Sequence, residues 1–168
     1  MMQHVISVLV ENKFGVLARI AGLFCGRGYN IDSLTVSPTN EEGVSKMTIA
    51  TSGDDAVIEQ IEKQLSKLID VISVSDLTGK HFIERELLLI KVNATAATRS
   101  ELMQITEIFK GKIVNVHESE LTIELSGRGE KIDAFIKMMA GFGIIDLART
   151  GKVAIGRKPG PSHFTNEV

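Results

Sequence analysis

The fold is indicated most clearly by the stretch VISVLVENKFGVLARIAGLFCGRG, residues 5–28. Its first part, Val5 to Val10, is a short apolar run rich in β-branched residues, which is typical of a buried strand. After Phe14 the apolar side chains recur at helical spacing, at Leu17, Ile20, Ala21 and Phe24. Gly28 is well placed to end that helix. The stretch therefore predicts a strand followed by a helix.

The following residues predict two more strands, a second helix and a last strand. Residues 29–37 and 44–51 alternate apolar and polar side chains, and the turn-forming cluster 38–43 between them predicts a hairpin. Either residue of the Asp54–Asp55 pair can cap a helix whose apolar face is formed by Val57, Ile58, Ile61, Leu65 and Leu68. A last strand is expected from about Val71 to Leu77. The order of elements is βαββαβ.

The same order then starts again in the second half of the chain. Residues 78–81 interrupt the pattern, and 87–92 is an apolar strand. Thr98 and Glu101 have the spacing of a capping box, at the start of a helix that is expected to end at Gly111. The remaining elements are expected at 113–116 and 121–125 (a hairpin), 132–139 (a helix), 144–148 (a strand) and 153–155 (a short extra strand).

Two βαββαβ units predict an α+β protein made of two tandem ferredoxin-like folds. The predicted domains are 1–78, a linker at 79–84, a C-terminal ferredoxin-like domain at 85–156, and a flexible tail at 157–168. In each domain two helices cover one face of the sheet and leave the other bare. We expect that bare face of the first domain to be apolar, through Leu34, Val36, Met47 and Ile49. An exposed apolar face usually marks an interface, so a two-fold homodimer is predicted.

The composition is that of an ordinary globular chain, with 43% hydrophobic and 24% charged residues. A net charge of −2 gives no reason to expect nucleic acid as a partner. The single cysteine, Cys25, fits a reducing cytosol. No apolar run approaches the roughly 20 residues that span a bilayer, and the first residues do not resemble a signal peptide. A cytoplasmic protein without a membrane association is expected.

The most informative candidate site is the turn between the first strand and the first helix. Free amide groups and the positive dipole end of a helix N-terminus favour a carboxylate. Gly15 would let a ligand approach the backbone, and Asn12 offers both donors and an acceptor. Asn30, at the beginning of the second strand, is a second candidate. An alternative interpretation makes Asn12 a helix cap, Gly15 a small residue at a crowded turn, and Asn30 a turn former.

Other motifs are weaker. Ser126-Gly127-Arg128-Gly129 precedes a helix but lacks the longer phosphate-loop pattern, so it is interpreted as a turn. The histidines are scattered without metal-ligand spacing, and Cys25 lies beside the apolar stripe of its helix; the histidines are His4, His81, His117 and His163. No catalytic constellation and no metal site are predicted.

Several segments closely resemble the small subunit of acetohydroxyacid synthase (acetolactate synthase). In the first half these are VENKFGVLARI (10–20), RGYNIDSLTV (27–36) and EQIEKQL (59–65). In the second half they are EREL (84–87), EIFKG (107–111) and KIDAF (131–135). The resemblance covers about 1–156, and the first half looks like an ACT domain, an amino-acid sensor with the βαββαβ order.

The resemblance implies a regulatory subunit without catalytic residues. Such subunits bind a catalytic subunit, stimulate it and make it sensitive to feedback inhibition by valine in branched-chain amino acid biosynthesis. Thiamine diphosphate, Mg and FAD are implied for the catalytic subunit and no cofactor for this chain. In the family, valine lies where two ACT domains of a homodimer meet. On this sequence that implies Asn12, Gly15, Val16 and Leu17 of one copy and Asn30 and Ile31 of the other.

Two other functions are compatible with the same order of elements. One is an ACT-domain regulator of another amino-acid pathway enzyme. The other is an RNA-recognition module, which needs aromatic side chains on its sheet and a basic surface. Aromatic residues make up only 5% of this chain, and its charge is negative, so the RNA-binding alternative is disfavoured.

Overall fold

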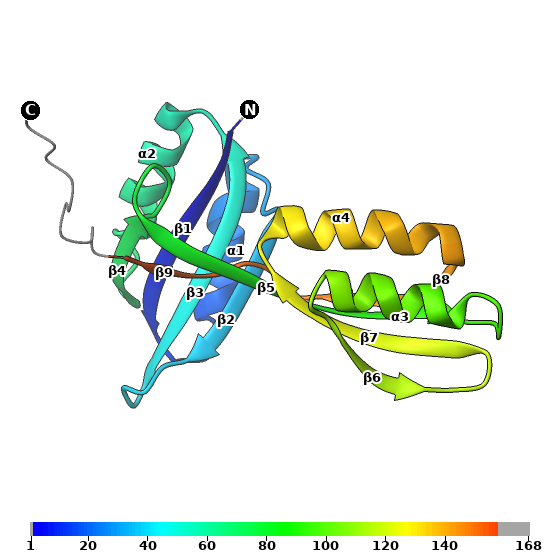
Figure 1. The fold of residues 1–168 in the computed structure, drawn as a ribbon. Helices are drawn as coiled ribbons and strands as arrows, with labels where there is room; N and C mark the ends of the chain where they lie inside the picture. Colours follow the sequence, from blue (N-terminus) through cyan, green and yellow to red (C-terminus); the bar gives the residue numbers. More distant parts are fainter. Residues whose placement is uncertain (1, 158–168) are drawn as a thin grey trace, which may run out of the picture. The chain divides into compact units, whose positions relative to one another are not determined.

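The computed structural model describes residues 2–157, which contain the predicted order of elements twice (Figure 1). The first run is β1 (Met2–Glu11), α1 (Val16–Gly26), β2 (Ser33–Pro38), β3 (Val44–Gly53), α2 (Asp55–Leu65) and β4 (Val71–Asp76). The second is β5 (Phe82–Asn93), α3 (Arg99–Ile108), β6 (Lys112–Val116), β7 (Glu120–Gly127), α4 (Gly129–Met139), the 3₁₀ helix η1 (Ala140–Phe142) and β8 (Ile144–Arg149), followed by β9 (Val153–Gly156). The predicted α+β fold with two βαββαβ units is confirmed.

The described residues divide into two compact units. Unit 1 contains residues 2–83 and 154–157, and unit 2 contains residues 84–153. Strand β5 begins in unit 1 and continues in unit 2, while β9 returns to pair with β5. The backbone amide of Arg157 donates to the carbonyl of His81, at 2.7 Å, which continues this pairing. The predicted tail lies outside the described residues apart from Arg157.

The sheet of unit 1 has the strand order β2-β3-β1-β4, with antiparallel neighbours. Helices α1 and α2 lie together on one face (Figure 1). Alternate residues of β1 point at these helices, and Ile6 and Val8 are completely buried. They pack against the apolar stripes of the helices, which include Ile20, Phe24, Ile61 and Leu65. The helical spacing in the sequence therefore marks the faces that form this core.

The prediction that Leu34, Val36, Met47 and Ile49 form a bare apolar face was wrong. The strand register places all four on the helix-covered face, opposite one another and in line with the core residues of β1. Met47 and Ile49 are fully buried, Leu34 is partly buried, and of the four only Val36 is exposed, at 42%. Alternation shows which side chains share a face, but the path of the chain decides which face the helices cover.

The opposite face of this sheet is mainly polar. Ser7 lies between Thr48 on β3 and Ser75 on β4, and Thr48 lies opposite Thr35 on β2. At one end, a small apolar cluster covers part of this face, formed by Val5, Leu77 and Ala154 with Phe82 packed against it. The start of β5 and strand β9 therefore cover part of the surface that was expected to be bare.

Helix α1 ends as the sequence predicts. The amide of Tyr29 donates to the carbonyl of Phe24, at 3.0 Å, and the amide of Gly28 donates to that of Cys25, at 3.1 Å. This pair of bonds is the Schellman motif, which needs a residue in the left-handed region. Gly28 has a φ of 70°, which glycine adopts without strain.

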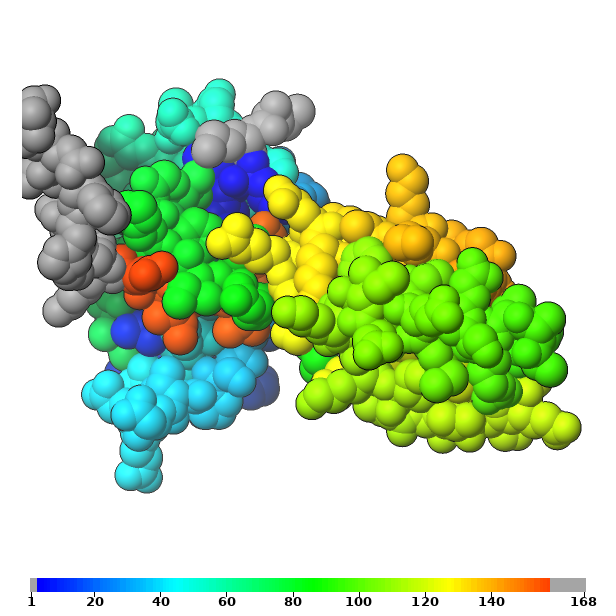
Figure 2. All heavy atoms as spheres, viewed as in Figure 1, coloured from blue at the N-terminus to red at the C-terminus, as the bar shows by residue number. Residues whose placement is uncertain are grey.

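Unit 2 repeats the architecture with the order β6-β7-β5-β8. Its core is formed by one face of β5 and β7 against α3 and α4, with the rings of Phe109 and Phe135 5.1 Å apart. Met103 and Ile108 of α3 are exposed. Figure 2 shows part of unit 2 with its side chains in space-filling form. None of the helices in residues 2–157 is long and apolar enough to cross a membrane.

The hydrogen bond from the helix to Thr98 that the predicted capping box at α3 requires does not form. Thr98 occupies the N-cap position, but its side chain makes no bond to the helix. The hydroxyl of Thr98 instead accepts from the amide of Thr95, at 3.0 Å. A threonine hydroxyl can bond to either neighbouring segment, and spacing alone does not decide between them.

Candidate ligand-binding site

The turn between β1 and α1 is held by backbone hydrogen bonds from both sides. The amide of Glu11 donates to the carbonyl of Asp70, at 2.8 Å, and the amide of Asn12 donates to that of Gly43, at 2.7 Å. Lys13 pairs with Glu11, which raises the pKa of Lys13 above its ordinary value. The turn is therefore a well-defined segment that can place side chains and amides in fixed positions.

Helix α1 begins at this turn without a side-chain cap. Its N-cap residue is Gly15, in the left-handed region with a φ of 83°, so the interpretation of Asn12 as a helix cap is wrong. Within the described residues, the side-chain amide of Asn12 is exposed and makes no hydrogen bond. Asn12 thus keeps its donors and its acceptor available at the surface.

The first amides of α1 also have no helical acceptor. Arg19 is the first residue to donate within the helix, to the carbonyl of Gly15 at 3.0 Å. The amide of Val16 donates to the carbonyl of Lys13 before the helix, at 3.5 Å, whereas the amides of Leu17 and Ala18 make no backbone hydrogen bond among the described residues. Of the four α-helices in residues 2–157, α1 alone has no acidic residue in its first turn. The partial positive charge at this helix end is therefore not offset by a carboxylate of the helix itself.

Arg19 is the charged residue that the sequence interpretation missed. Its guanidinium forms an ion pair with the carboxylate of Asp70, which lies in the loop before β4. Its Nη2 atom is 4.0 Å from the position that a Cβ on Gly15 would occupy. Since Gly15 and Arg19 are four residues apart on one helix face, that spacing was the available signal.

The apolar members of the predicted site differ in exposure. Val16 is buried in the core of unit 1, whereas Leu17 is about half exposed. Phe14, just before them, is fully exposed. An exposed aromatic and an exposed leucine next to unpaired amides form a surface with both apolar and polar character.

Asn30 and Ile31 lie at the other end of α1. The carbonyl of Asn30 accepts from the hydroxyl of Thr51, at 2.5 Å, and its side-chain amide donates to Asp32, at 2.8 Å. Ile31 is partly buried against the core. Hydrogen bonds from Ser52 and then Asn30 lower the pKa of Asp32 against the opposing effect of burial. An open pocket runs past these residues, and its lining includes Tyr29, Asn30, Asp32 and Ser52.

The two halves of the predicted site do not meet within one chain. Helix α1 has 11 residues, so at ~1.5 Å per residue its ends are separated by roughly 16 Å. Asn12 and Gly15 precede the helix, and Asn30 and Ile31 follow it. A free amino acid is too small to contact both ends.

The other residues noted in the sequence analysis lie outside the turn at the start of α1, in the following surroundings. His4 is buried, with its ring nitrogens 3.5 Å from a carboxylate oxygen of Asp76 and 3.8 Å from one of Asp55. At the Ser126–Gly129 turn, the amine of Lys131 donates to the carbonyl of Ser126, at 3.0 Å. Cys25 is exposed. Residues 2–157 contain no group of three or more His, Cys, Asp or Glu residues arranged to hold a metal ion, and His163 lies outside that range.

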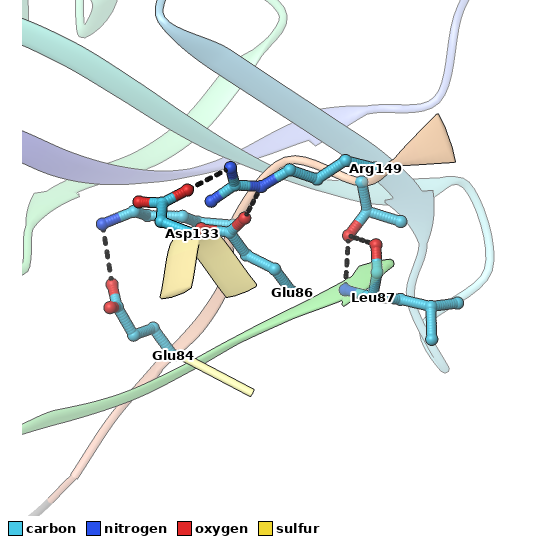
Figure 3. A network of polar contacts seen from close by, with 7 residues as sticks. Glu84, Glu86, Leu87, Asp133 and Arg149 are labelled. Carbon is cyan, nitrogen blue, oxygen red and sulfur yellow. Dashed lines mark hydrogen bonds and ion pairs between the residues drawn. The ribbon is translucent and has the colours of Figure 1, made fainter. Parts of the chain in front are cut away.

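A network of charged residues in unit 2 joins β5, β8 and α4 (Figure 3). Arg149 donates to Glu86 and, at 2.6 Å, to Asp133, and these bonds raise the pKa of Arg149 above its ordinary value. Lys152 pairs with Glu84 at 3.2 Å. Glu86 is buried and lies beside the first residue of α4, since a Cβ on Gly129 would be 2.9 Å from its Oε1. The ion pairs of Arg149 thus connect β5, β8 and α4 within unit 2.

Comparison with known proteins identifies both units. Residues 6–73 match the family described as AHAS small subunit-like ACT domain, and residues 85–158 match the small subunit of acetolactate synthase. The chain is 51% identical over 166 residues to the acetolactate synthase small subunit of Aquifex aeolicus, covering 98% of this chain and 86% of that protein. It is 47% identical over 157 residues to the acetolactate synthase isozyme 3 small subunit of Escherichia coli, covering 93% and 96% of the two chains.

A solved structure supports the same assignment. The acetolactate synthase small subunit from Thermotoga maritima superposes with a TM-score of 0.89 at 40% sequence identity, covering 95% of this chain and all of that one. The likeness therefore extends over both units in sequence and in fold. The chain belongs to the family of acetolactate synthase small subunits, and its first half is an ACT domain of that family.

Proposed function

We propose that this chain is the regulatory subunit of a cytoplasmic acetolactate synthase. In this proposal it binds the catalytic subunit, stimulates it, and confers feedback inhibition by valine in branched-chain amino acid biosynthesis. Thiamine diphosphate, Mg and FAD would be held by the catalytic subunit. The functional domains are 1–78 and 85–156, joined by residues 79–84. The observation that carries the proposal is the uncapped start of α1, where open amides lie beside Gly15.

The ligand would be bound between two copies of the chain. Asn12, Gly15 and Leu17 of one copy supply the start of α1, and Asn30 and Ile31 of the other supply the approach to β2. Two α1 helices lying side by side and antiparallel would bring the start of one next to the end of the other. Two-fold symmetry would then create two equal sites.

Three features of unit 1 support such a dimer in place of the mistaken apolar sheet face. Strand β2 lies at an edge of the sheet, with β3 as its neighbour. Val36 on that strand is exposed, as are Phe14 and Leu17 at the start of α1. A second copy placed against this side would cover apolar side chains that one chain leaves in water.

A site shared by two chains couples ligand binding to the arrangement of the dimer. If valine weakens the active complex tenfold, that complex must weaken valine binding tenfold, a coupling of about 1.4 kcal/mol. Selectivity would come mainly from the polar groups that hold the amino-acid head group. Leucine and isoleucine would bind detectably, though more weakly than valine, because an apolar pocket discriminates one methylene by only about 1–3 kcal/mol.

The decisive experiment is a valine titration of catalytic-subunit activity with and without this chain. Stimulation by the chain, and valine inhibition only in its presence, are expected. Calorimetry should give a clear preference for valine over aspartate. A catalytic subunit whose rate and valine response do not change when the chain is added would contradict the proposal, as would equal affinity for the two amino acids.

A further inference from the structure

We infer that the guanidinium of Arg19 binds the carboxylate of the amino-acid ligand and that Asp70 holds the guanidinium in position. This inference rests on the proposed function, because it concerns the same site at the start of α1. It adds a charged residue to a site that otherwise consists of amides, an asparagine and apolar side chains.

The position of Arg19 is the first support. Its Nη2 atom is 4.0 Å from the Cβ position of Gly15, and no side chain lies between them because residue 15 is glycine. A carboxylate that accepts from the open amides of Leu17 and Ala18 lies at the same helix end. Gly15 therefore leaves room for a ligand to contact the amides and the guanidinium together.

The bonding of Arg19 is the second support. A guanidinium has five N–H donors, and in the described part of the chain its side-chain hydrogen bond is from Nη1 to Asp70. Nη2, which is the atom nearest Gly15, remains able to donate. The side chain of Arg19 is 55% exposed, whereas that of Asp70 is 12% exposed, so the aspartate is the anchored member of the pair. A planar fork fixed at one edge can bind a second carboxylate at the other.

The surroundings of Asp70 explain how it holds the guanidinium. Its carbonyl accepts from the amide of Glu11, so the aspartate is tied to the end of β1, just before the ligand-binding turn. The Asp70 carboxylate compensates the charge of Arg19 while the site is empty. A ligand carboxylate must then share the guanidinium with the Asp70 charge. Asp70→Asn removes that charge but keeps an oxygen that can accept from Nη1 and hold the guanidinium, so this change should not weaken binding.

The test compares two variants that break the same ion pair, Arg19→Gln and Asp70→Asn. Calorimetry on the full chain would measure the affinity for valine and for valinamide, which lacks the carboxylate. Arg19→Gln should weaken valine binding about 10- to 100-fold, the range for a hydrogen bond to a charged group, and leave valinamide binding unchanged. Asp70→Asn should bind valine as tightly as the wild type or more tightly. Arg85→Gln removes an exposed arginine from unit 2 and serves as the matched control, with no expected change.

The outcomes distinguish binding of the ligand by Arg19 from a purely structural role of the Arg19–Asp70 ion pair. Equal weakening by Arg19→Gln and Asp70→Asn would show that the pair only braces the turn, and the inference would be wrong. Unchanged valine affinity in Arg19→Gln, with binding intact in the wild type, would also overturn it while leaving the proposed function standing. A wild-type chain that binds no valine would contradict both. If Arg19→Gln does not fold, Arg19→Lys keeps the charge without the fork and should lie between the wild type and a complete loss.

Discussion

The two units contain the same turn twice, between the first strand and first helix of each, and they use it differently. In unit 1 the turn leads into an uncapped helix with Gly15 in the left-handed region and no acidic residue in the first turn. In unit 2 the hydroxyls of Thr95 and Thr98 bond to each other and to the local backbone, and Glu101 lies in the first turn of α3. The same topology therefore leaves the helix start in unit 1 without an acidic residue in its first turn, whereas the corresponding helix start in unit 2 has Glu101 there.

The same contrast extends to the beginning of the last helix in unit 2. Glu86 is buried beside the first residue of α4 and is paired with Arg149. A carboxylate of the chain is thus close to the N-terminus of both helices in unit 2. In unit 1, Asp54 caps α2 by accepting from the amide of Val57, at 2.9 Å. Only α1 begins without a nearby carboxylate of its own helix or cap among the described residues.

The largest expected effect is that of Gly15→Asp, which places a carboxylate at the start of α1. A folded chain that still stimulates the catalytic subunit but has lost at least about 100-fold in valine affinity is expected, because the new charge occupies and repels the position of the ligand carboxylate. Gly15→Asn has nearly the same shape and equal tolerance of the left-handed region, without the charge. Valine inhibition curves for both variants would measure the difference. Full valine sensitivity in Gly15→Asp would show that the site lies elsewhere.

Gly129→Ala tests whether the buried Glu86 beside the first residue of α4 contributes to the stability of unit 2. The new Cβ would lie 2.9 Å from Oε1 of Glu86, so the buried carboxylate must shift. We expect a loss of about 1–3 kcal/mol in the free energy of unfolding, measured by urea denaturation. Gly141→Ala is the control, because its Cβ would meet nothing within 4 Å. A stable Gly129→Ala chain would show that Glu86 is free to move.

Ala18→Glu gives α1 the first-turn carboxylate that α3 has at Glu101. The exposed glutamate should stabilise the helix by about 0.3–1 kcal/mol through its interaction with the dipole. It should also weaken valine binding, by roughly tenfold, because it competes for the same amides. Ala18→Gln is the uncharged control. A stabilised chain with unaltered valine affinity would contradict the prediction that the glutamate and valine compete for the amides at the start of α1.

The smallest expected effect concerns Asp32, at the other end of α1. Its pKa is lowered in the folded chain, chiefly by the hydroxyl of Ser52, so the bond contributes stability above the unfolded pKa near 3.8. That contribution is lost as the pH falls through the lower, folded pKa. Ser52→Ala should cost about a few tenths of a kcal/mol at neutral pH, since Asp32 is well solvated and screened. Unfolding curves of the two proteins should converge in acid, and a difference that persists there would assign the loss to packing.

Much of the fold could be predicted because its signals are local. Strand alternation, helical stripes and the glycine that ends α1 are properties of a few neighbouring residues, and all of them reappear in the structure. The capping-box prediction at Thr98 was wrong because its hydroxyl can bond either to the helix or to the preceding Thr95, and it bonds to Thr95. The prediction for Met47 and Ile49 was wrong because the face that becomes covered depends on where α1 and α2 cross the sheet, and not on β3 itself.

For the candidate site, the sequence by itself determined which residues surround the start of α1, because Asn12, Gly15 and Leu17 are neighbours along the chain. It also determined the family, through matches that cover both units. Only the tertiary structure decided that α1 starts uncapped, that Asp70 reaches Arg19 from 51 residues away, and that α1 separates Asn30 from Gly15. The physical reason is range: conformational preferences act between residues a few positions apart, whereas ion pairs and shared faces depend on how distant segments pack.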